Sequence, residues 1–259
     1  MKRRYKLFMI ILLGMLATII INSMRVTSKT TFTSIGDGLS VGMTPYNVAG
    51  TSFNDYLKEK LETNNDLKYY NNEFSYVHQN IHELNEHLNN NDLGKNSHTP
   101  IKQIIAKSDL LTIAIGIDEF ASKSLVEEIT TETIENYLKE MNLFLKNIRE
   151  FYEKQIIILG VYPAKNFDKK DAIEVNSKLK ILCGEYNALF LDILATSLHE
   201  EYYLEKSSYY MNYLAHKDIA KTLYLMYKKK QLIFVINHFI CFTSTFYSYI
   251  KMVMFSNLY

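Results

Sequence analysis

The sequence predicts an α/β protein built on a doubly wound, mainly parallel five-stranded sheet, arranged as a flavodoxin-like three-layer sandwich. Short β-prone runs alternate with longer helical patterns from residue 30 to about residue 227, which is typical of a parallel sheet. Two of the runs, Leu110–Ile115 and Ile156–Val161, are almost entirely apolar, as strands buried on both faces are. The first run, Thr30–Ile35, ends in a glycine-rich turn, a junction where such sheets commonly bind ligands.

The individual elements follow from the same patterns. The expected strands are Thr30–Ile35, Leu67–Ser75, Leu110–Ile115, Ile156–Val161 and Leu189–Ile193. The expected helices are Ser52–Glu62, Val77–Asn89, Ile101–Lys107, Thr131–Tyr152, Ala172–Glu185 and Tyr213–Tyr227. Right-handed crossovers place the carboxyl ends of all parallel strands at one edge of the sheet. We therefore expect any binding pocket to lie at that edge.

The N-terminus, residues 1–28, has the composition of a targeting segment. Basic residues in Lys2–Lys6 precede an uninterrupted apolar or small run, Leu7–Ile21, which is typical of a secretory signal or a signal anchor. The run is short for a full membrane span of about 20 residues, and no convincing cleavage site follows it. We expect an uncleaved membrane helix in the cell membrane with the bulk of the chain extracytoplasmic. Secretion after signal cleavage is the alternative.

The globular domain is expected over residues 29–228, followed by a hydrophobic tail over residues 229–259. Within the tail, Leu232–Ile250 is long enough to span a membrane. The three lysines at 228–230 would then lie on the outer side, against the positive-inside tendency. A second span, an amphipathic surface segment and a tail outside the fold all stay open.

Composition excludes several classes of function. The net charge of +1, with both signs mixed along the chain, gives no indication of a nucleic-acid partner. The two cysteines, Cys183 and Cys241, have no metal-ligand spacing, and no cofactor motif is present, so we expect neither a metal nor a cofactor. His78 and His82 stand four residues apart on a helical pattern, but no third ligand accompanies them.

Four motifs in chain order resemble the SGNH/GDSL hydrolases. Gly36-Asp37-Gly38-Leu39-Ser40 resembles the family's first block, Gly-Asp-Ser-Leu-Ser. Residues 108–119 resemble its third block, residues 157–163 its next strand, and residues 210–220 its last block. The resemblance implies an α/β fold and ester hydrolysis by a serine nucleophile, a histidine base and an aspartate. It also implies that backbone amides, a glycine and an asparagine stabilise the oxyanion.

Carried over position by position, the resemblance implies a degenerate site. The nucleophile position is Gly38, the base position is Tyr210, and the acid position falls on Ser207 or Ser208. The oxyanion asparagine is replaced by Asp118, and no counterpart of the second-block glycine stands out near residues 74–79. The positions that still match the family pattern are Gly36, Asp37, Gly116 and Asn212.

Two functions from different classes follow from this pattern. The first is a hydrolase-like binding protein that holds an acylated or glycan ligand of the cell envelope, with tyrosines such as Tyr209 near the site available for stacking. The alternative is an active ester hydrolase with relocated groups, such as Ser40 and His216. A helical Ser40 points about 200° away from the Gly38 direction, which makes it a poor nucleophile. A domain with an unused groove is a third, structural interpretation.

Overall fold

The computed structural model describes Gly14 and residues 29–204 and 208–230. The fold lies in one compact unit, Lys29–Tyr224, which is the part considered below. The expected N-terminal membrane helix, apart from Gly14, and the apolar run Leu232–Ile250 lie outside the described residues. Within the described ranges, no helix is both long and apolar enough to cross a bilayer.

A five-stranded sheet forms the centre of this unit, and every pair of neighbouring strands is parallel. Its spatial order is β2-β1-β3-β4-β5, the flavodoxin-like order, in which the chain reverses direction across the sheet after β2. The strands are β1 (Thr30–Gly36), β2 (Leu67–Ser75), β3 (Leu110–Ala114), β4 (Gln155–Leu159) and β5 (Leu189–Leu191). The five-stranded parallel sheet expected from the sequence is thus confirmed.

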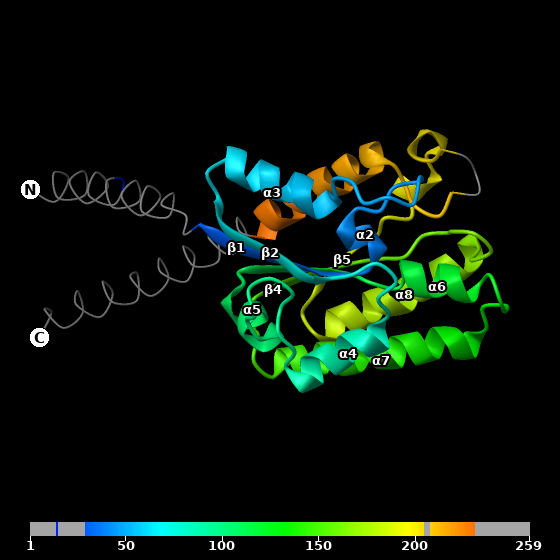
Figure 1. Ribbon diagram of the computed structural model, residues 1–259, viewed down its shortest axis with the longest axis horizontal. Coiled ribbons are helices and arrows are strands. Elements are labelled where there is room, and N and C mark those ends of the chain that lie inside the picture. The colour runs from blue at the N-terminus through cyan, green and yellow to red at the C-terminus, as the bar shows by residue number, and fades with distance from the viewer. Residues whose placement is uncertain (1–13, 15–28, 205–207, 231–259) are drawn as a thin grey trace, which may run out of the picture. The chain divides into compact units, whose positions relative to one another are not determined.

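Helices cover both faces of the sheet (Figure 1). On one face, α3 (Phe53–Thr63) packs beside the helical residues 213–224, where the Lys60 ammonium lies 5.1 Å from the Tyr224 ring centroid. The other face carries α4 (Ile81–Asn90), α5 (Ile101–Lys107), α7 (Thr131–Arg149) and α8 (Lys169–Glu185). Two short helices, α2 (Gly38–Val41) and α6 (Ile117–Lys123), start at the carboxyl ends of β1 and β3.

The helices begin and bury side chains for identifiable reasons. Ser52 caps α3 and Asn80 caps α4, each through a capping box. In each box the side chain of the cap residue accepts a hydrogen bond from the backbone amide three residues later, and the acidic side chain there accepts one from the cap residue's amide. On α7, Ile134, Met141 and Ile148 recur every seven residues on one face of the helix, and all three are buried. Together with the apolar strands, these side chains form a continuous core that holds the sheet's carboxyl edge in place.

Some boundaries differ from the expectation. Helix α4 begins at Ile81 rather than at Val77, because the preceding residues form a turn in which His78 has a φ of +64°. Helix α6 was not predicted, since the sequence after Gly116 has only one short turn of helical pattern. Both differences fall where the chain passes the carboxyl ends of β1 and β3.

Candidate functional site

The turn after β1 is fixed by two residues. Gly36 has a φ of +150°, and a β carbon there would collide with the carbonyl oxygen of Ala114 on the neighbouring strand. Asp37 is fully buried and caps α2, since its Oδ1 accepts a hydrogen bond from the Leu39 amide at 3.1 Å. The Asp37 amide in turn donates to the Ala114 carbonyl at 2.9 Å. The first motif therefore lies at the carboxyl edge, where the sequence predicted it.

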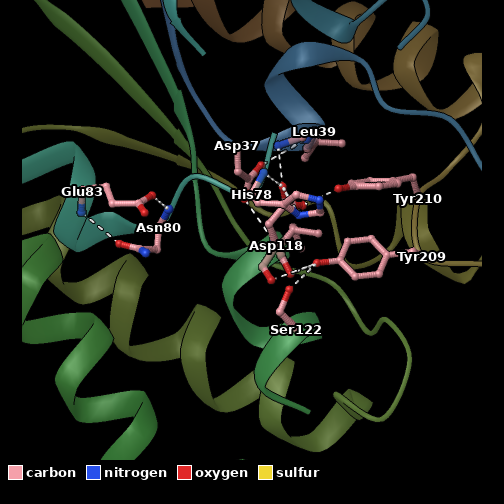
Figure 2. A network of polar contacts seen from close by, with 11 residues as sticks. Asp37, Leu39, His78, Asn80, Glu83, Asp118, Ser122, Tyr209 and Tyr210 are labelled. Carbon is pink, nitrogen blue, oxygen red and sulfur yellow. Dashed lines mark hydrogen bonds and ion pairs between the residues drawn. The ribbon is translucent and has the colours of Figure 1, made fainter. Parts of the chain in front are cut away.

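Asp118 is the centre of the polar network at this edge (Figure 2). Its buried carboxylate accepts hydrogen bonds from the Gly38 amide at 2.9 Å and the His78 amide at 2.6 Å, both on Oδ2. Its Oδ1 accepts a third hydrogen bond from the Tyr210 hydroxyl at 2.8 Å. One carboxylate thus collects donors from three segments that are far apart in the sequence.

Two carboxyl groups are neighbours in this site, and their charges interact. The Asp118 amide donates to Asp37 Oδ2 at 3.3 Å. Burial, and then the negative charge of Asp118, raise the pKa of Asp37 well above its ordinary value, although backbone hydrogen bonds oppose the shift. Burial and the same Asp118 charge raise the pKa of the Tyr210 hydroxyl, which keeps it a neutral donor.

The position of Gly38 has no room for a side chain. A β carbon built there would lie 2.5 Å from the Tyr210 hydroxyl oxygen, 2.8 Å from Asp118 Oδ2 and 2.9 Å from Tyr210 Cε1. All three distances are shorter than a normal carbon contact. The Tyr210 ring, which is only 2% exposed, therefore occupies the space in front of Gly38.

His78 belongs to this site although sequence reasoning did not place it there. Its left-handed backbone turns its amide toward Asp118, and its imidazole is exposed at the protein surface, with Nδ1 3.9 Å from Asp118 Oδ2. Glycine adopts such a backbone most readily, and the second-block glycine of the family that the chain resembles has no counterpart near residues 74–79. Only the count of residues between β2 and the capping box of α4 could have indicated this position.

Ser40 and His216, the relocated catalytic groups of the alternative hypothesis, have other hydrogen-bond partners. The buried Ser40 hydroxyl donates back to the sheet, to the carbonyls of Ile35 at 3.3 Å and Ala114 at 3.4 Å. The buried His216 imidazole accepts the Phe53 amide on Nδ1 at 3.1 Å, and its Nε2 lies 3.5 Å from the Met43 carbonyl. These contacts do not join the hydroxyl to the imidazole.

The remaining motif positions have structural partners. Gly116, at a φ of +114°, starts α6 against the Tyr137 ring, where a β carbon would lie 3.0 Å from a ring atom. The Asn212 side chain donates to the Glu201 carbonyl at 2.7 Å and accepts the Leu214 amide at 2.9 Å, so it fixes a loop and a helix start rather than facing Asp118. Ser207 lies outside the described residues.

Tyrosines line the side of the site that the last motif supplies. Half-buried Tyr209 donates to the Asp118 carbonyl at 2.9 Å, and its ring lies 4.4 Å from the Tyr210 ring, centroid to centroid (Figure 2). Tyr162, at the end of β4, is fully buried, and its hydroxyl has no hydrogen-bond partner among the described residues. Burial, followed by the charges of neighbouring groups that include Asp37 and Asp118, raises the Tyr162 pKa.

No group of three His, Cys, Asp or Glu side chains in the described ranges could hold a metal ion. His78 and His82 have separate partners, since the His82 ring lies 3.8 Å from Glu86 and 3.7 Å from Glu140. The side chains at this edge are two buried carboxyl groups, Asp37 and Asp118, surrounded by hydrogen-bond donors and aromatic rings.

The fold is that of known esterases and lipases. A lipase/acylhydrolase from Enterococcus faecalis superposes with a TM-score of 0.58 at 14% identity, covering 78% of this chain and 96% of its own. An acetylxylan esterase from Geobacillus stearothermophilus gives 0.58 at 16% identity, with 76% and 94% covered. The chain has an SGNH-type hydrolase fold. A lipase from a goat rumen metagenome, at a TM-score of 0.59 and 20% identity, covers 75% of this chain and 96% of its own.

By sequence alone, no protein-family model and no curated protein matches this chain. At identities of 20% or less, the structural similarity concerns the fold, and the chemistry has to be argued from the side chains described above.

Proposed function

We propose that this protein uses an SGNH-type fold to bind a ligand and does not perform triad chemistry. The observation that carries the proposal is the Asp118 carboxylate, which already occupies the amides of Gly38 and His78 and the hydroxyl of Tyr210. In the hydrolases that the chain resembles, backbone amides stabilise the oxyanion of the reaction. Here a substrate oxyanion would meet a buried negative charge instead of free donors, which destabilises it.

The nucleophile position supports the same proposal. Gly38 has no side chain, and the Tyr210 hydroxyl stands 2.5 Å from the place of its missing β carbon. Tyr210 also takes the place of the histidine base, and its raised pKa makes it a poor proton acceptor at neutral pH. Because the members of a triad act as a unit, loss of the nucleophile or of the base alone removes roughly 10⁶ in rate.

The proposed ligand is an acylated or glycan component of the cell envelope. The exposed His78 ring and half-buried Tyr209 lie at the surface beside Asp118 and offer a polar and an aromatic contact to such a molecule. Two structural neighbours are named for activities on lipids and on acetylated xylan. A site that keeps their fold and loses the reaction would retain recognition of similar groups.

The proposed location is the outer face of the cell membrane. The support is the basic N-terminal flank followed by the apolar run Leu7–Ile21. An alkaline-phosphatase fusion after Lys228 should be active, and N-terminal sequencing of the cellular protein should start at or near Met1. An inactive fusion would overturn the external location, and a new N-terminus after residue 20 would indicate secretion instead of anchoring.

Hydrolysis is tested directly on the full-length protein in neutral detergent. We expect no turnover of p-nitrophenyl acetate and no labelling by a fluorophosphonate above the levels of Ser40→Ala and His216→Ala. Turnover or labelling that either substitution lowers by 10³-fold or more would favour the relocated-triad alternative. Each variant is checked for unfolding by its thermal transition, because both side chains are buried.

Binding is tested with acetylated xylo-oligosaccharides and with short-chain monoacylglycerol as probes. A ligand at 100 times its Kd adds about 2.7 kcal/mol to stability, which raises the Tm by roughly 5 °C or more in a domain of this size. His78→Asn, which tolerates the left-handed backbone, should remove this shift, whereas the exposed-histidine control His199→Asn should keep it. No shift with either probe would leave the domain without the proposed ligands and refute this assignment.

A further inference from the structure

A second candidate site lies away from the carboxyl edge. A groove of about 530 Å³ runs over β1 and β2 beside α5. Lys68 is the second residue of β2, and Lys107 ends α5 just before β3, so the groove lies toward the amino ends of the strands. Asp118 and its partners lie at the opposite ends of the same strands, which makes the two sites distinct.

The groove exists because β2 is an edge strand. It pairs with β1 on one side only, and α5 packs against β1. The pairing places Thr31 beside Tyr69 and Thr33 beside Asn71, so hydroxyl, amide and aromatic side chains form the floor. A polar floor on β1 is unusual in this sheet, whose central strands are otherwise apolar.

The wall of the groove is a rigid loop. The buried Glu73 carboxylate accepts hydrogen bonds from the amides of Asn96 at 3.2 Å and Ser97 at 2.9 Å, and from the Ser97 hydroxyl at 2.9 Å. These bonds hold Ser97 and Thr99 at the groove. A preformed wall lowers the cost of ordering the site when a ligand binds.

The charge of the groove is positive. Lys68 and Lys107 both line it, no acidic side chain does, and neither lysine forms an ion pair in the part of the chain that the structure describes. Other lysines, such as Lys154 with Asp109 at 2.9 Å, are paired. On the floor, the Thr33 hydroxyl is bonded to Ser108 and the Asn71 amide donates to Glu73 Oε1 at 3.2 Å. The two ammonium groups and the Thr31 hydroxyl are thus the donors that remain for an anion with several acceptor oxygens.

We propose that this groove binds a phosphate group carried by a larger polar molecule. A phosphate can accept hydrogen bonds from both lysines and from a threonine hydroxyl at once, which a single carboxylate does less well. The volume is several times that of one phosphate, so the rest of the ligand has room beside Tyr69 and Ile104. A phospholipid headgroup and a soluble phosphate ester share this chemistry.

The test uses the full-length protein in neutral detergent and two probes. Glycerol 1-phosphate is titrated by calorimetry, and mixed micelles of phosphatidylglycerol are compared with micelles of phosphate-free diacylglycerol. Binding of glycerol 1-phosphate indicates a soluble ester, and binding of phosphatidylglycerol alone indicates a lipid headgroup. Lys68→Gln/Lys107→Gln should weaken either interaction at least tenfold, because each substitution removes a charged donor.

The matched control is Lys180→Gln/Lys221→Gln, which removes the same charge from exposed positions outside the groove. Its affinity should stay within threefold of the unsubstituted protein. Equal losses in both double variants would mean a general charge effect and would overturn the proposal, as would the absence of binding of both probes at millimolar concentration. Since all four lysines are exposed, the thermal transition should be unchanged in both variants.

Discussion

Adding one methyl group at Gly38 should destabilise this protein, although the backbone there accepts alanine. Gly38 is not among the glycines with a positive φ, and alanine is favoured over glycine in helices by up to about 1 kcal/mol. The added β carbon would nevertheless lie 2.5 to 2.9 Å from Tyr210 and Asp118 atoms. Overpacking of this kind costs about 1–3 kcal/mol. Gly38→Ala should therefore lower the free energy of unfolding by about that amount.

A double-mutant cycle with Tyr210→Ala isolates the cause. Tyr210 supplies two of the three close atoms, so in the Tyr210→Ala background the alanine at 38 should cost clearly less, although Asp118 Oδ2 at 2.8 Å remains close. The assay is urea unfolding of the full-length protein in a fixed neutral detergent. Gly184→Ala is the control, because a β carbon on that helical glycine of α8 meets no atom within 4 Å. Equal costs at 38 and 184, or an equal cost at 38 in both backgrounds, would refute the packing argument.

Three further predictions concern buried polar groups. Burial lowers the pKa of His216 to about 4, so folding favours the neutral imidazole. The free energy of unfolding should therefore fall by about 3 kcal/mol as pH falls from 6.5 to 4. In urea unfolding over that range, His216→Asn should lose much less stability. Tyr162→Phe should be neutral or stabilise by up to about 1–2 kcal/mol in the same assay, since it removes a buried hydroxyl without a partner, and a clear loss would show that the hydroxyl is bonded. Because the pKa of Asp37 is raised in the folded protein, its contribution to the free energy of unfolding falls as pH rises above about 4. Asp118→Asn removes the repelling charge and should weaken that fall, measured from pH 4 to 8. The same pH dependence in both proteins would show that the Asp118 charge does not act on Asp37.

Much of the fold could be predicted because local and global signals agree along this chain. The apolar runs of β3 and β4 could only be buried strands, and the stripe of Ile134, Met141 and Ile148 on α7 faces the core as its spacing requires. Short elements were harder to predict. Helix α6 is seven residues long, too short for periodicity to separate from a turn, and its start depends on the left-handed Gly116.

The site was predictable in position but not in chemistry. The motifs placed Gly38, Asp118 and Tyr210 at one edge, and the structure brings these three into direct contact. Sequence alone indicated that each of these three residues departs from the pattern of the family that the chain resembles. It could not show that they are mutually dependent, because the dependence lies in distances across the site, nor that His78 joins them through its backbone. A backbone donor leaves no side-chain signature in a sequence.

That mutual dependence has a consequence for any attempt to engineer a nucleophile at residue 38. A serine introduced at 38 would meet the Tyr210 hydroxyl, so the single step toward a nucleophile is blocked while Tyr210 stays. Replacing Tyr210 first removes a buried ring and leaves the Asp118 carboxylate with one donor fewer. Each of these single substitutions should destabilise the protein, because each disturbs contacts that the other residues make. A serine engineered at residue 38 therefore requires accompanying substitutions at Tyr210 and Asp118 in the same variant.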